Sequence, residues 1–148
     1  MDSINFPVWN PPKQLLPLYE GRIPAGFPSP AADYVQRRID LNERLVHDKI
    51  ATFFIRASGD SMRDAGIQDG SILVVNSARP PVSGDVVVAS VDGKHTVKRL
   101  VKRGDRFELH PDNASGDYPV IMVEHELNIF GVVTSVITEF VRLVPRKS

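Results

Sequence analysis

Residues 85–100 read DVVVASVDGKHTVKRL, two runs rich in β-branched residues on either side of an Asp-Gly pair. A two-residue hairpin turn of the tightest type needs positive φ at both central positions, which Gly adopts freely and Asp tolerates. Asp92-Gly93 therefore predicts an antiparallel hairpin that joins a strand over Asp85–Val91 to a strand over Lys94–Leu100.

The same pattern of short apolar runs and turn residues continues on both sides of this hairpin. Asp69-Gly70, Ser83-Gly84 and Gly104-Asp105 supply further turns. We expect a mainly β domain, built from twisted or partly closed antiparallel sheets with little helix. The other strands that the pattern predicts are Thr52–Ala57, Ser71–Asn76, Arg106–Leu109, Val120–Val123 and Asn128–Phe140.

Residues 1–39 differ from the rest of the chain in composition. Seven of the twelve prolines lie among the first thirty residues. Each proline removes a backbone donor and restricts the residue before it, so we expect an extended N-terminal arm. Apolar residues such as Trp9 and Leu15 favour an arm that lies on a surface, and a floppy tail is the alternative.

Two short helices are expected where the arm meets the rest of the chain. The spacing of Val35 and Ile39 permits a helix over 31–39. Asp40, with Glu43 three residues later, resembles a capping box that opens a short helix from Leu41 to His47. We therefore expect the β-rich domain to cover residues 40–148, after an arm of residues 1–39.

Composition excludes several classes of function. Eighteen basic residues balance eighteen acidic ones, so net charge gives no general attraction to nucleic acid or anionic lipid. The absence of cysteine excludes disulfides, and we expect a cytoplasmic protein. No apolar stretch approaches the roughly 20 residues of a membrane helix, and we expect no signal peptide. The histidines lack metal-binding spacing, so we expect neither a metal nor a cofactor.

The stretch ASGDSM at residues 57–62 contains a candidate nucleophile, Ser61, which precedes Lys98 by 37 residues. A hydroxyl is a weak nucleophile, and a neutral amine can remove its proton. Strand alternation places Thr96 and Lys98 on one face and His95 on the other, so His95 cannot face Ser61 if Lys98 does. The residues alone leave open the alternative that Lys98 belongs to a solvated basic stripe.

Several separated motifs lie at residues 57–62, 64–70, 84–89, 96–100 and 130–133. Together these motifs closely resemble the LexA and UmuD family of self-cleaving serine peptidases. They agree in order and spacing from about Gly26 to Phe140, and residues 26–35 are especially similar to UmuD. The resemblance implies a LexA and signal-peptidase-like fold.

The resemblance also implies roles for individual residues. It makes Ser61 the nucleophile and Lys98 the general base, with Ala25-Gly26 as the bond that is cut. Backbone N–H groups of Ser61 and Met62 are then candidates for the oxyanion hole. Ala25 departs from the best-known UmuD proteins, which have Cys-Gly at this bond, whereas LexA-type repressors have Ala-Gly.

The resemblance further implies a function in the SOS response to DNA damage. A RecA filament on single-stranded DNA would promote self-cleavage, and the shortened homodimer would serve an error-prone translesion polymerase, with a UmuC-like partner subunit. The segment before Ala25 is too short and too rich in proline for a helix-turn-helix domain, so no sequence-specific DNA binding is expected.

Two other functions deserve comparison. A signal-peptidase-like enzyme shares the Ser and Lys chemistry but needs a membrane anchor, which this sequence does not supply. A catalytically silent dimeric binding module is the non-enzyme alternative. Two products split at Ala25-Gly26 would distinguish an active peptidase from such a module.

Overall fold

The computed structural model describes residues 12–19, 21–26 and 36–141, and the chain divides into two compact units, Met1–Arg44 and Leu45–Ser148. The first unit contains a two-stranded antiparallel sheet of β1 (Leu16–Tyr19) and β2 (Gln36–Ile39). β1 is extended, as the proline-rich composition of residues 1–39 predicted. The second unit contains the larger sheet and is described separately below.

The helix predicted over 31–39 is wrong for its last four residues, because Gln36–Ile39 form strand β2. Their partner is β1, twenty residues earlier in the chain, with Leu16 opposite Ile39 and Tyr19 opposite Gln36. Pairing between distant segments overrides a weak local preference for helix. The remainder of that predicted helix, residues 31–35, lies outside the described residues.

The short helix α1 (Leu41–Leu45) begins after Asp40, as the capping pattern predicted. Asp40 Oδ1 accepts a hydrogen bond from the backbone N–H of Asn42 at 2.8 Å. In a capping box the Glu43 side chain would reach back to the backbone N–H of Asp40. Here it forms an exposed ion pair with Lys13, at 3.0 Å. The helix ends at Leu45, two residues before the expected end at His47.

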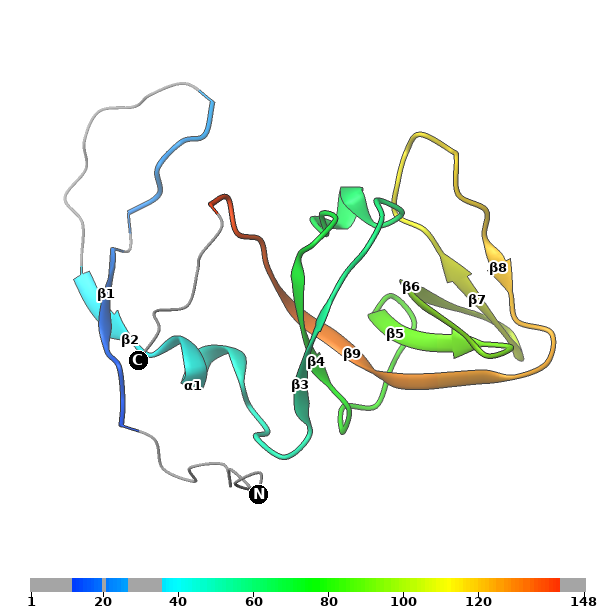
Figure 1. Cartoon of the computed structure of the whole chain (residues 1–148), viewed down its shortest axis with the longest axis horizontal. Helices are drawn as coiled ribbons and strands as arrows, with labels where there is room; N and C mark the ends of the chain where they lie inside the picture. The colour runs from blue at the N-terminus through cyan, green and yellow to red at the C-terminus, as the bar shows by residue number, and fades with distance from the viewer. Residues whose placement is uncertain (1–11, 20, 27–35, 142–148) are drawn as a thin grey trace, which may run out of the picture. The chain divides into compact units, whose positions relative to one another are not determined.

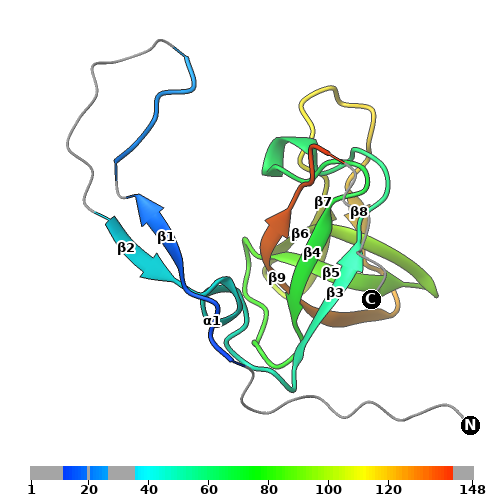
Figure 2. The ribbon, with the colours of Figure 1, turned by 60° about the vertical axis from the view of Figure 1, so that its left-hand side comes forward.

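The second unit contains a seven-stranded antiparallel sheet in the order β3-β4-β9-β5-β6-β7-β8 (Figure 1). The long strand β9 lies between β4 and β5. In Figure 2 the strands of this sheet run in clearly different directions, as a strongly twisted sheet requires. The strands are β3 (Thr52–Arg56), β4 (Ile72–Asn76), β5 (Val86–Val91), β6 (Lys94–Arg103), β7 (Arg106–His110), β8 (Ile121–Met122) and β9 (Leu127–Ile137).

The hairpin predicted at Asp92-Gly93 is confirmed. Asp92 has φ 48° and Gly93 has φ 81°, and the register joins β5 to β6 from Val91 opposite Lys94 to Val86 opposite Arg99. All seven predicted strands are present, so the prediction of a mainly antiparallel β fold is correct. β6 continues three residues beyond the predicted end at Leu100.

Gly131 lies where β9 passes between β4 and β5. The register of β9 shifts against β4 between Val74 and Val75, and shifts again against β5. A Cβ atom at Gly131 would lie 2.6 Å from Val75 Cγ1 and 2.9 Å from the carbonyl oxygen of Asn76. Only glycine allows the two backbones to approach so closely at this position.

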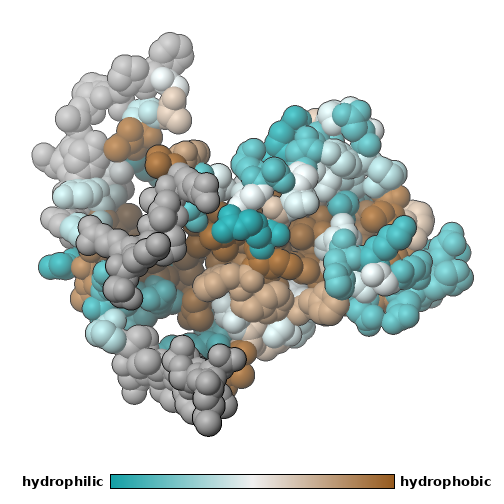
Figure 3. All heavy atoms as spheres, viewed as in Figure 1, coloured by the Kyte–Doolittle hydropathy of each residue, from teal (hydrophilic) through white to brown (hydrophobic). Residues whose placement is uncertain are grey.

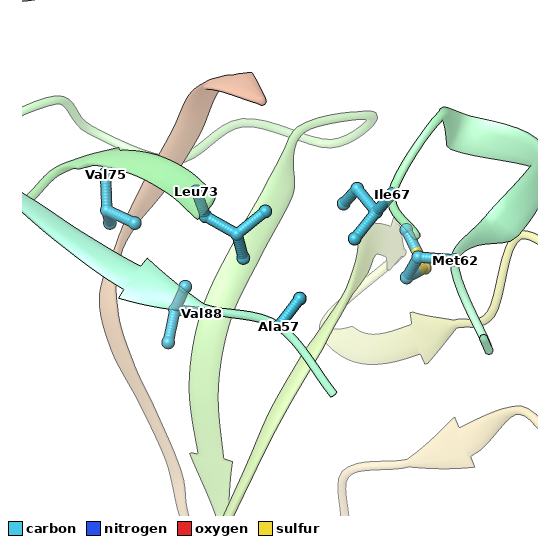
Figure 4. Close-up of a cluster of buried hydrophobic side chains, with 6 residues drawn as sticks. All are labelled: Ala57, Met62, Ile67, Leu73, Val75 and Val88. Atoms are coloured by element: carbon cyan, nitrogen blue, oxygen red, sulfur yellow. The ribbon is translucent and has the colours of Figure 1, made fainter. Parts of the chain in front are cut away.

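The core of the second unit consists of two clusters of buried apolar side chains. One packs beneath the segment after β3 and is shown in Figure 4; its buried members are Ala57, Met62, Ile67, Leu73, Val75 and Val88. The other lies toward β6 and β7 and contains Val87, Ala89, Leu100, Leu109 and Val132. Met62 belongs to the first cluster, so burial of its side chain holds the residue next to Ser61 in place.

Apolar side chains also remain exposed on β3, the edge strand of the large sheet. Phe54 has 62% of its surface exposed, and Phe53 and Ile55 have 37% each. Hydrophobic surface is visible over the second unit on the face shown in Figure 3. An exposed apolar edge strand is a surface on which another chain can pack.

Candidate active site

The segment that carries Ser61 follows β3 and is held at its base by backbone hydrogen bonds. The N–H of Ala57 donates to the carbonyl of Ser71, and the N–H of Gly70 donates to the carbonyl of Ala57, both at 2.8 Å. The N–H of Gly59 donates to Asp69 Oδ1 at 2.8 Å. With Ala57 and Met62 buried on either side, the backbone at Ser61 has little freedom to move.

A second loop, residues 112–114, braces the Ser61 segment from the other side. The N–H of Asp112 donates to the carbonyl of Ser61, and the N–H of Asp64 donates to the carbonyl of Asp112, both at 2.8 Å. The side-chain amide of Asn113 donates to the carbonyl of Asp60 at 2.7 Å. Loop 112–114 therefore fixes the backbone immediately before, at and after the candidate nucleophile.

Lys98 lies on β6 and reaches the Ser61 hydroxyl from the side. Its Nζ lies 3.0 Å from Ser61 Oγ. The same amine donates to Thr96 Oγ1 at 2.8 Å and to the carbonyl of Val97 at 3.2 Å. The structure thus brings Ser61 and Lys98 together, and Thr96 shares their face of the strand as alternation predicted.

Burial lowers the pKa of the Lys98 amine below its ordinary value, because desolvation disfavours the charged form. The side chain is half-buried. Among the residues that the structure describes, no carboxylate pairs with Lys98 to stabilise its charge. The solvated basic stripe is therefore a poor description of this lysine, since its neutral form is more accessible than that of a surface lysine.

Ser61 and Lys98 line a cleft of about 240 Å³ that also includes Met62 and His95. The ring of His95 packs edge-on against Phe130, with centroids 5.3 Å apart. No hydrogen bond joins His95 to Ser61 or Lys98 within the described part of the chain. The histidine contributes to the wall of the cleft, and the amine of Lys98 is the basic group in contact with the hydroxyl.

A larger cavity of about 880 Å³ lies between β7, β8 and the start of β9. Phe107, Met122 and Ile129 line it together with several charged residues. It contains neither a serine nor a lysine, and so offers no nucleophile and amine in contact. We therefore place the candidate active site in the smaller cleft.

The backbone N–H groups of Ser61 and Met62 were the predicted oxyanion donors. In the described part of the chain neither group donates a hydrogen bond to another residue, whereas the next one, of Arg63, donates to the carbonyl of Asp60 at 3.1 Å. Two adjacent N–H groups that are free in this way can donate hydrogen bonds to an oxygen atom on which negative charge develops.

Ala25 and Gly26 lie in the connection between β1 and β2, in the first unit. Both residues are exposed. A Cβ atom placed on Gly26 would meet nothing within 4 Å. The backbone of this predicted cleavage site is therefore open to approach from solvent.

Two further findings concern the described residues. They contain no cluster of three or more acidic, histidine or cysteine side chains that is arranged to hold a metal ion. None of the helices in the described ranges is long and apolar enough to cross a bilayer.

Comparison with known proteins assigns the family. A model of the family described as Peptidase S24-like matches residues 17–134. Protein SamA of Salmonella typhimurium is 47% identical over 131 residues, which cover 88% of this chain and 91% of SamA. Protein ImpA of Escherichia coli is 49% identical over 121 residues, 82% of each chain. The LexA repressor of Sodalis glossinidius is 39% identical over 123 residues, 82% of this chain and 60% of the repressor.

The chain therefore belongs to the Peptidase S24-like family of serine peptidases. Within that family it is a UmuD-like member of the LexA and UmuD group, which connects it with self-cleaving peptidases that act in mutagenesis.

Loop 112–114 is the part of the site that sequence reasoning missed. Asp112, Asn113 and Ala114 follow β7 and lack any periodic pattern or motif. The only signal in the sequence is a run of polar and small residues typical of a turn. Nothing in that run indicates that it meets a segment about 50 residues earlier.

Proposed function

We propose that Ser61 and Lys98 form a catalytic dyad that cuts the chain's own Ala25-Gly26 bond. The contact of 3.0 Å between Lys98 Nζ and Ser61 Oγ is the observation that carries this proposal. The half-buried amine has a lowered pKa, so its neutral form can accept the hydroxyl proton.

The reaction follows the acyl-transfer scheme of serine peptidases. Lys98 removes the proton from Ser61 Oγ, which attacks the carbonyl carbon of Ala25. The N–H groups of Ser61 and Met62 stabilise the negative charge on the carbonyl oxygen. The ammonium of Lys98 then gives its proton to the leaving amine of Gly26. The carbonyl carbon of Ala25 is then joined to Ser61 Oγ in an ester. Lys98 removes a proton from a water molecule, which hydrolyses this ester and restores Ser61.

The position of Ala25-Gly26 suits such a reaction. Both residues are exposed, and neither has a side chain larger than a methyl group. A narrow cleft can therefore admit the backbone at this bond without a clash. The proposed division of the chain is an arm of residues 1–39 that contains the bond and a peptidase domain of residues 40–148.

We infer that cleavage is the switch in a DNA-damage response. A RecA filament on single-stranded DNA promotes the cut in the cytoplasm, and the processed chain is a homodimer that serves an error-prone translesion polymerase with a UmuC-like subunit. Membership of the UmuD-like group supports this inference. The exposed apolar residues of β3 provide surface for such protein partners.

The proposal is tested by incubating the full chain with RecA, single-stranded DNA and a nucleotide cofactor, followed by mass analysis. We expect two products divided at Ala25-Gly26, formed more slowly without the filament. Ser61→Ala should yield neither. An intact chain under all conditions would instead favour the catalytically silent binding module.

Cleavage of one chain of the homodimer by the other is tested by mixing two variants that cannot cleave themselves. Ser61→Ala supplies a cleavable bond without a nucleophile, and Gly26→Arg supplies the nucleophile with a bond blocked by its side chain. Cleavage of the Ser61→Ala chain in the mixture requires association of the two chains. Subunit exchange between the two variants is demonstrated first. If the mixture then shows no cleavage, the reaction is restricted to a single chain.

A further inference from the structure

The proposed cleavage site lies in the connection between the two strands of the short sheet β1-β2. Leu16, Pro17, Leu18 and Tyr19 pair with the four residues of β2 in one continuous antiparallel register. Ala25 and Gly26 lie in the connection between these strands. Cutting that bond therefore leaves the two paired strands on different products.

Side-chain contacts extend the pairing beyond the ends of the strands. The backbone N–H of Gln14 donates to Asp40 Oδ2 at 3.1 Å. Arg38 Nη2 donates to the carbonyl of Leu15 at 3.2 Å. An isolated two-stranded sheet is marginally stable in water, so these added contacts matter for holding the segment Lys13–Tyr19 in place.

Asp40 connects this segment to helix α1. Its Oδ2 accepts the N–H of Gln14, while Oδ1 accepts the N–H of Asn42 in the first turn of the helix. Only 7% of the residue is exposed. The pKa of this carboxyl is lowered chiefly by the Gln14 N–H, so it stays ionised at neutral pH and the contact weakens only in acid.

We propose that β2 and Asp40 form a docking site for the extended segment Lys13–Tyr19, and that this site continues to bind the N-terminal fragment after the chain is cut. This proposal rests on the proposed function, because self-cleavage at Ala25-Gly26 is what would produce the fragment. Cleavage and release of residues 1–25 are then separate steps, and β2 becomes a free strand edge only at the second.

The occupant of this site follows from the register, since the segment already pairs there in the uncut chain. Before the cut, the connecting loop holds the segment near β2 at an effective concentration on the order of millimolar. After the cut, binding depends on the concentration of free fragment. We therefore expect retention in concentrated solution and loss on dilution.

The test uses the full chain with Ser61→Ala and a recognition sequence for a site-specific protease inserted between Ala25 and Gly26. An external protease makes the cut, so the outcome does not depend on the activity of Ser61 and Lys98. The amide resonances of β2 and Asn42 are followed in a ¹⁵N-labelled sample. They should stay at their positions after cutting and change only when the fragment is removed by repeated dilution and concentration.

Adding a synthetic peptide of residues 12–25 should then restore the original resonances. A peptide with Leu18→Pro loses a backbone donor from β1 and should bind about tenfold more weakly, as expected when a hydrogen bond and strand pairing are lost. Leu18→Val keeps the donor and favours a strand, so it is the matched control and should bind like the original peptide.

Two results would overturn the proposal. One is a shift of the β2 amide resonances to positions typical of an unfolded chain as soon as the bond is cut, with no change when the peptide is added. The other is equal binding of the Leu18→Pro and Leu18→Val peptides, because apolar adhesion without strand pairing would explain it.

Discussion

The segment around Ser61 and the connection around Ala25-Gly26 are held in opposite ways. Buried Met62 and the hydrogen bonds from loop 112–114 fix the first on both sides. The second is exposed at the bond itself, and the segments on either side of it are joined by two paired four-residue strands and two hydrogen bonds near the ends of these strands. A rigid nucleophile and an accessible, loosely held substrate segment are what a chain needs if it is to act on itself.

The largest expected effect is on the rigid side of this comparison. Ser61→Ala removes the nucleophile and Lys98→Ala removes the base, so each should reduce self-cleavage below detection in a gel or mass assay. Lys98→Arg is the matched control for charge, because a guanidinium stays protonated and cannot act as a base. Normal products from Lys98→Arg would show that another group removes the proton.

The next prediction concerns the substrate side. Gly26→Arg should block cleavage by excluding the bond from the cleft, while Ser61 keeps its reactivity toward a small acylating probe. Since a side chain at Gly26 meets no neighbour in the described structure, folding should be unchanged. Loss of probe reactivity together with cleavage would mean that the substitution damages the site rather than the substrate.

Gly131→Ala should destabilise the fold without touching either side of the reaction. Its Cβ would lie 2.6 Å from Val75 Cγ1 and 2.9 Å from the Asn76 carbonyl. Overpacking of this kind costs about 1–3 kcal/mol of unfolding free energy, measured by urea denaturation. Gly26→Ala is the control, and its midpoint should match that of the unchanged chain.

The smallest effect is expected in loop 112–114, which holds the Ser61 segment in place. Asn113→Ala removes the donor to the Asp60 carbonyl and the acceptor for Arg63 Nη2. Each hydrogen bond contributes about 1 kcal/mol, so loss of both should slow self-cleavage by about thirtyfold at most. Asn113→Asp keeps the acceptor and should fall between. An unchanged rate in Asn113→Ala would show that burial of Met62 alone positions Ser61.

Local patterns predicted most of the fold, whereas the pair of Ser61 and Lys98 was predicted from the resemblance to the LexA and UmuD family. Asp92-Gly93 carries its turn geometry in its own residue types, and the strands follow from runs of apolar residues. Features that depend on distant segments were missed. Gln36–Ile39 form a strand because β1 pairs with them, and Asn113 matters because loop 112–114 meets Asp60. Neither partnership leaves a periodic signal in the sequence.

The pH dependence of self-cleavage tests the central claim, that a neutral Lys98 activates Ser61. A free lysine titrates at about 10.4, and burial lowers the pKa of the Lys98 amine below that value. The neutral fraction of this amine should therefore increase as pH rises from 7 towards 10. The account predicts a rate that rises with pH in the unchanged chain and is absent at every pH in Lys98→Ala. A rate that stays flat from pH 7 to 10, or that rises equally in Lys98→Ala, would contradict it.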